Sequence, residues 1–161
     1  MEFIEFLDPV EIEIIRMVEE AGYNTEENSS LCSLNKNYAG FLKKNEKIIV
    51  ICTENAKIKE GYTILGMEND DKIDRIAINI KKALRHEAVH VAQECNDGNV
   101  LDIKEKLTFK ATKLEALEAS KKISGEEEKE KQAYILEDKP KLVIKELGKY
   151  CLWWLINLNC L

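Results

Sequence analysis

The chain has 161 residues, of which 45% are hydrophobic and 34% are charged. This balance excludes a disordered or collagen-like chain and predicts one globular domain over residues 1–161. The net charge of −6 argues against a nucleic-acid partner, because phosphate binding requires a positive surface.

The first part of the chain predicts one helix followed by a small sheet. Asp8 and Pro9 are typical of a helix N-terminus, and Gly22 is expected to end that helix. We expect residues 22–36 to form a polar loop. Strands are expected at residues 38–42 and 47–53, joined as a hairpin, with a weaker third strand at 61–67.

Helix-starting and helix-ending residues divide the rest of the chain into four helices. Asp70 and Asp71 place acidic groups at the positive end of the first, and Gly98 follows its end. The four helices are expected at residues 70–95, 101–123, 126–138 and from 140 to the C-terminus. Trp153 and Trp154 are expected to pack the last helix against the protein. The sequence therefore predicts an α+β fold that is mainly helical.

The cysteines and the chain start bear on the compartment. Five cysteines lack any C-x-x-C spacing, and residues 1–6 are acidic where a secretion signal is basic. We therefore expect a cytoplasmic, reducing compartment in which cysteines such as Cys52 and Cys95 act as small buried thiols. The longest apolar run, residues 150–161, is shorter than the ~20 residues that a bilayer span needs, so stable membrane insertion is not expected.

The two histidines of the chain lie four residues apart in one predicted helix. Residues i and i+4 share a helix face, so His86 and His90 can converge on one tetrahedral zinc ion. Glu87, next to the first histidine, can reach a water beside the ion and act as a general base. The alternative is a pair of helix histidines that bind no metal.

The His-Glu-x-x-His motif followed by a later glutamate resembles the gluzincin class of zinc metallopeptidases. Residues 130–136 resemble the E-x-x-A stretch of the ImmA/IrrE-like metallopeptidases, and residues 138–151 look like small uncharacterised zincins from phage genomes. In the ImmA/IrrE-like family, the glutamate of the second motif completes the zinc site, which implies Glu130 here. The resemblance implies a minimal zincin: a small sheet, an active-site helix, a second ligand-bearing helix and one Zn²⁺ ion.

Several acidic residues compete for roles around the predicted ion. Glu118 is an alternative third ligand to Glu130, and Glu137 or Asp138 is a candidate for orienting a histidine from behind. Tyr134, four residues after Glu130, either donates a hydrogen bond to a reaction oxyanion or packs in the core.

These residues predict zinc-dependent hydrolysis of peptide bonds in a peptide or protein substrate, with Glu87 as general base. The substrate is expected along the edge of the strand at 38–42 or 61–67. The alternative is a non-catalytic binding or regulatory protein with a structural or absent metal. The sequence leaves the oligomeric state open.

Overall fold

The computed structural model describes residues 2–59, 70–104 and 108–153. It confirms an α+β fold that is mainly helical, with one three-stranded sheet. In chain order the elements are the 3-10 helix η1 (Glu2–Phe6), α1 (Pro9–Glu20), β1 (Asn24–Glu27), α2 (Ser30–Leu34), β2 (Gly40–Lys43), β3 (Ile48–Ile51), α3 (Thr53–Lys59), α4 (Asp70–Cys95), the 3-10 helix η2 (Ala111–Lys113), α5 (Leu114–Ser124), α6 (Glu127–Leu136) and α7 (Pro140–Cys151).

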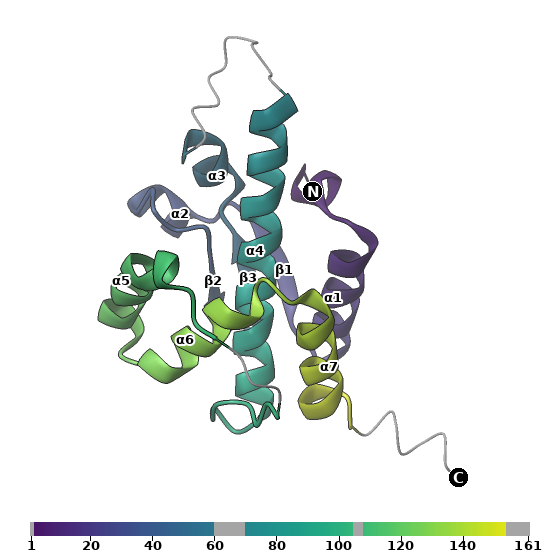
Figure 1. The fold of residues 1–161 in the computed structure, drawn as a ribbon. Coiled ribbons are helices and arrows are strands. Elements are labelled where there is room, and N and C mark those ends of the chain that lie inside the picture. Colours follow the sequence, from purple (N-terminus) through teal and green to yellow (C-terminus); the bar gives the residue numbers. More distant parts are fainter. Residues whose placement is uncertain (1, 60–69, 105–107, 154–161) are drawn as a thin grey trace.

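The 26-residue helix α4 is the central element, and most of the other elements pack against it. Helices α1 and α7 lie together on one side, and α6 packs beside its C-terminal half (Figure 1). Apolar side chains at helical spacing form its buried face. They include Ile76, Ile80, Leu84, Ala88 and Val91.

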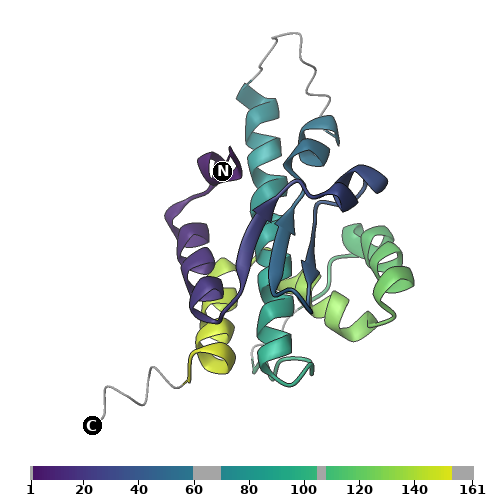
Figure 2. The same ribbon diagram turned by 180° about the vertical axis from the view of Figure 1, so that it is seen from behind.

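The sheet packs on another face of α4, with the strand order β1-β3-β2. Strands β2 and β3 form the predicted antiparallel hairpin, and β1 pairs with β3 in parallel. Strand β2 is the edge that faces α5 and α6 (Figure 2). Within the part of the chain that the structure describes, no strand pairs with the outer side of β2.

The prediction of a loop over residues 22–36 is wrong. Residues 24–27 form β1, because their backbone pairs with β3 even though their side chains are polar. The short helix α2 follows, and the Ser29 hydroxyl accepts a hydrogen bond from the Leu31 amide at its start. Helix α3 follows β3, where the sequence indicated no helix.

Three of the four predicted later helices appear as α4, α6 and α7. The helix expected over 101–123 is shorter at its start, because regular α-helix begins only at Leu114. Trp153 is 60% exposed, so the expectation that it packs down the last helix is wrong. The strand expected at 61–67, Trp154 and the rest of the C-terminal run lie outside the described residues.

Four cysteines form two disulfides. One joins Cys32 to Cys52, with Cα atoms 5.5 Å apart, and the other joins Cys95 to Cys151, with Cα atoms 5.1 Å apart. The expectation of buried thiols is therefore wrong for these residues, and the cysteines no longer support a reducing compartment. None of the helices within the described ranges combines the length and apolar character needed to cross a bilayer.

Candidate metal site

Two residues on α4 and one on α6 form a cluster suited to a metal ion. One ligand atom from each of His86, His90 and Glu130 lies within 4.8 Å of the other two. Glu130 Oε2 is 3.3 Å from His86 Nε2 and 3.6 Å from His90 Nε2. A tetrahedral ion with bonds of about 2.0–2.1 Å separates its ligand atoms by about 3.3 Å. The two distances to Glu130 are therefore close to those that zinc requires.

Both histidines turn the same nitrogen toward the cluster. His86 Nδ1, on the far side of its ring, donates to Glu137 Oε2 at 3.2 Å. His90 Nδ1 donates to Gln93 Oε1 at 2.8 Å. A neutral histidine that donates through Nδ1 presents the lone pair of Nε2, so these two contacts direct both Nε2 atoms toward a metal once the rings are neutral.

The partners of the histidines are themselves fixed by further contacts. Lys113, at the start of α5, donates to Glu137 Oε1 at 2.8 Å. The buried Gln93 amide donates to the Lys129 carbonyl at 3.2 Å and to Gln132 Oε1 at 3.0 Å. These contacts tie the imidazole orientations to α5 and α6.

Charges around the cluster shift the pKa values of its members. Burial lowers the pKa of His86, but hydrogen bonds to Glu130 and Glu137 outweigh it and raise the pKa to about 10. Burial also acts on Glu130, but its contacts with the histidines hold its pKa far below the usual range. Glu130 is therefore ionised, as a metal ligand must be.

Glu87 is a buried carboxylic acid beside the cluster. Burial raises its pKa, and the neighbouring carboxylates Glu130 and Glu137 add to this, while the two histidines oppose it. Its side chain lines the cavities on both sides of the cluster. A general base works best when its pKa lies near the pH of the reaction, and a raised pKa moves a carboxylate in that direction.

Arg85 connects the cluster to the N-terminal helix. Its guanidinium donates to the fully buried Glu11 carboxylate of α1, with Nε 2.7 Å from Oε1, and to the Glu137 carbonyl at 3.2 Å. Glu11 Oε2 in turn accepts from the backbone amide of Asp8, at the start of α1. The residue before His86 is thus fixed by both α1 and the end of α6.

The remaining sequence candidates divide clearly. Glu118 is exposed on α5 and is not part of the cluster, whereas Glu130 is. Glu137, and not Asp138, contacts His86. The Tyr134 ring packs against His86 at 4.5 Å, and its hydroxyl makes a hydrogen bond of 2.8 Å with Ser120 Oγ. The Tyr134 hydroxyl is therefore hydrogen-bonded to α5 in this structure.

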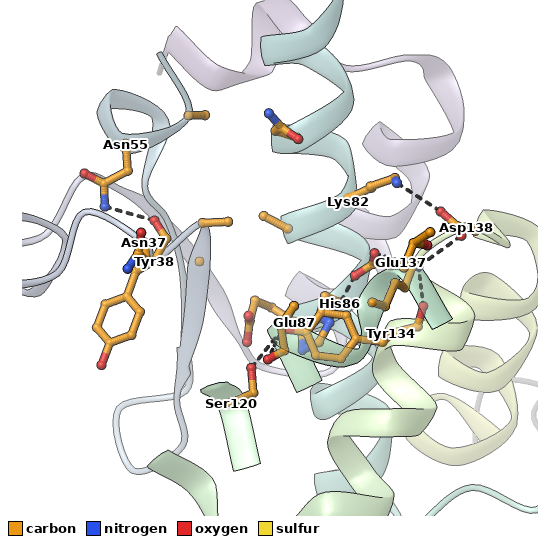
Figure 3. Close-up of a pocket in the computed structure, with 18 of the residues that line it drawn as sticks. Asn37, Tyr38, Asn55, Lys82, His86, Glu87, Ser120, Tyr134, Glu137 and Asp138 are labelled. Carbon is orange, nitrogen blue, oxygen red and sulfur yellow. Dashed lines mark hydrogen bonds and ion pairs between the residues drawn. The ribbon is translucent and has the colours of Figure 1, made fainter. Parts of the chain in front are cut away.

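Two cavities flank the cluster, and both are lined by Tyr38, Gly40, His86, Glu87 and Ser120. One, drawn in Figure 3, has a volume of about 460 Å³ and is here termed the basic end. Its lysines are Lys36, Lys82, Lys110 and Lys113. The other has a volume of about 500 Å³ and is termed the apolar end; its apolar residues include Leu31, Leu34, Phe41, Leu42 and Ile123. The two cavities adjoin at these shared residues beside the cluster, and together they are termed the cleft.

Sequence reasoning missed Gln93 and Lys113. Gln93 follows His90 by three residues, so helical spacing alone puts both on one face and signals the contact. Lys113 reaches Glu137 across 24 residues of sequence, and no local pattern signals that pair.

Comparisons with known proteins identify the family. No curated protein matches the chain, and no solved structure matches it. One family model, described as a domain of unknown function, matches residues 3–152, which is most of the chain. The protein therefore belongs to the DUF8637 family.

Proposed function

We propose that the protein is a zinc-dependent peptidase whose ion is held by His86, His90 and Glu130. The observation that carries the proposal is the convergence of these three ligand atoms within 4.8 Å of one another, beside the buried Glu87. Structural zinc sites are usually closed by four protein ligands, whereas catalytic sites combine three with an exchangeable position. The cluster found among the described residues contains three, which favours catalysis over a purely structural role.

The donor chemistry fits zinc. Two neutral imidazole nitrogens and one carboxylate form a known ligand set of catalytic zinc. Each imidazole donates a hydrogen bond from its Nδ1–H to a fixed oxygen acceptor, as metal-binding histidines generally do. Zinc, when bound, acts as a Lewis acid and lowers the pKa of water from about 15.7 toward about 7.

The chain's own residues supply the proton transfers and the orientation. Glu87 Oε accepts a proton from the attacking water and then delivers it to the nitrogen of the leaving amine. Glu137 keeps the proton of His86 at Nδ1, so that the opposite nitrogen stays a ligand throughout.

The edge strand β2 supplies a binding surface for the substrate backbone. Gly40, the first residue of β2, lies directly beside the proposed base, since a Cβ atom there would be 3.4 Å from Glu87 Cγ. A peptide paired with the outer side of β2 would therefore pass over the catalytic groups. The proposed partner is a peptide or protein, in line with the negative net charge, which disfavours nucleic acid.

Two variants test the proposal. Elemental analysis of the purified protein should find one zinc per chain, and His86→Ala should lose it. Glu87→Gln should keep its zinc and lose turnover of a mixed peptide library by about 10²–10⁴-fold, the usual contribution of a general base. A parent protein without stoichiometric zinc would contradict the metal assignment.

The same assays address the non-catalytic alternative. Stoichiometric zinc together with no peptide cleavage by the parent would favour a binding or regulatory protein. Equal turnover by the parent and Glu87→Gln would instead refute the assignment of the base.

A further inference from the structure

The two ends of the cleft differ in charge, and the basic end has an excess of positive groups. The Asp138 carboxylate forms ion pairs with three lysines: Lys110 at 2.8 Å, Lys113 at 3.0 Å and Lys82 at 3.3 Å. Among the described residues that line this end, the carboxylates are Asp138, Glu137 and Glu87, and Glu87 also lines the other end. Lys36 is a further, exposed lysine there. A carboxylate of a ligand would therefore be attracted to this end.

The apolar end has the opposite character. Leu34 on α2 is 77% exposed and Ile123 on α5 is 64% exposed, although both are large apolar residues. Its lysine, Lys44, already pairs with Glu94 at 2.9 Å and Glu126 at 3.3 Å. Exposed apolar side chains gathered at a cavity mark a surface for an apolar group of a ligand.

The direction of β2 orders these two ends along a bound peptide. Ala39, just before β2, lines only the basic end, whereas Leu42 in β2 and Lys44 just after it line only the apolar end. Antiparallel pairing is the more stable arrangement of two strands. A peptide bound antiparallel to β2 has its amino-terminal part at the apolar end and its carboxyl-terminal part at the basic end.

We propose that the cleft selects extended peptides with an apolar side chain before the bond to be cleaved and a carboxylate after it. The carboxylate belongs either to an aspartate or glutamate side chain or to the C-terminus of the peptide. This inference rests on the proposed function, because the metal cluster defines the position of the cleaved bond.

Peptide binding to the zinc-loaded Glu87→Gln variant tests the selection without requiring turnover. The probes are fluorescent octapeptides of four kinds: leucines then glutamates, the reverse order, leucines then lysines, and leucines then serines with a free or an amidated C-terminus. The first kind should bind at least about tenfold more tightly than the reversed and lysine peptides. A gain from the free terminus in the serine pair would identify the terminal carboxylate as a sufficient source.

Charge and apolar variants on the same background locate the two preferences. The double variant Lys36→Glu and Lys110→Glu should abolish the preference for glutamate over lysine, while Lys122→Glu, on the exposed surface of α5, should leave it unchanged. Leu34→Ser should weaken binding of all leucine peptides by about tenfold, and Leu114→Ser, an exposed leucine that lines neither cavity, should not.

The outcomes separate this inference from the proposed function. Cleavage of a mixed library by the parent, with no dependence on leucine or glutamate, would overturn the inference and leave the peptidase assignment intact. The predicted order of binding without cleavage would support the cleft chemistry and contradict the peptidase assignment. Equal affinity for the forward and reversed peptides, or no binding of any probe, would overturn the inference.

Discussion

Replacing Glu137 by glutamine should weaken zinc binding although Glu137 is not a ligand. The Glu137 carboxylate accepts from His86 Nδ1 at 3.2 Å with one oxygen and from Lys113 Nζ at 2.8 Å with the other. A glutamine offers only one oxygen, so its NH₂ group must face either the imidazole N–H or the ammonium group. One of the two contacts is therefore lost.

The arrangement of the lysine decides which contact fails. Lys113 also contacts Asp138 Oδ2 at 3.0 Å, so an amide turned away from it leaves it paired. The glutamine oxygen then faces His86, but its hydrogen bond with Nδ1–H involves no charged acceptor. It therefore lacks the negative charge that makes His86 Nε2 a stronger metal ligand. Loss of such a supporting carboxylate typically costs 10–100-fold in metal affinity, or about 1.4–2.8 kcal/mol.

Competition with a chromophoric chelator at fixed pH measures this affinity. Glu118→Gln is the matched control, because it makes the same charge change at an exposed site on α5. Circular dichroism should show the same helical content in the parent and both variants. A zinc affinity of Glu137→Gln within about twofold of the parent would refute the reasoning that the carboxylate orients His86.

Three further predictions concern stability and pH. Glu11→Ala leaves the Arg85 guanidinium without its buried partner and should lower the free energy of unfolding by about 3–5 kcal/mol in urea titrations; a loss below about 1 kcal/mol would contradict it. Cys151→Ser opens the disulfide to Cys95, which spans 56 residues, and should lower the free energy of unfolding by about 4 kcal/mol; equal stability of the oxidised and reduced parent would argue against that bond. The pKa of His86 is raised to about 10. Zinc must therefore displace its proton, so affinity should rise about tenfold per pH unit between pH 6.5 and pH 9; a pH-independent affinity in chelator competition would count against the assignment.

The parts of the fold that sequence predicted are those with strong local signals. Helix α4 has apolar residues at a regular spacing and begins at an acidic pair. Strand β3 is a run of four aliphatic residues, and its hairpin with β2 follows from the short polar connection. In each of these elements the burial pattern and the local propensity agree, so that the sequence alone predicts the element.

The missed elements take their stability from distant partners. Strand β1 has the sequence Asn-Thr-Glu-Glu, and only its parallel pairing with β3 makes it a strand. The two disulfides depend on which cysteines the fold brings together, which spacing does not specify. Local patterns carry no information about either kind of contact.

The candidate site follows the same division. The shared face of His86 and His90 is a property of one helix, and the structure brings both toward Glu130. The choice between Glu130 and Glu118 needed the packing of α6 on α4, which the sequence motif alone left open. Lys113 depended on the packing of α5 beside Glu137 and could not be predicted.

The ion pair between Glu11 and Arg85 has a consequence for how the chain can be shortened. Arg85 immediately precedes the first histidine, and its partner comes from near the beginning of the chain. A fragment starting after α1 would still contain every proposed ligand, yet it would leave that guanidinium uncompensated and uncover the surfaces of α4 and α7 that α1 protects. A shortened chain that keeps this ion pair and its contact with the Asp8 amide must therefore start at or before Asp8.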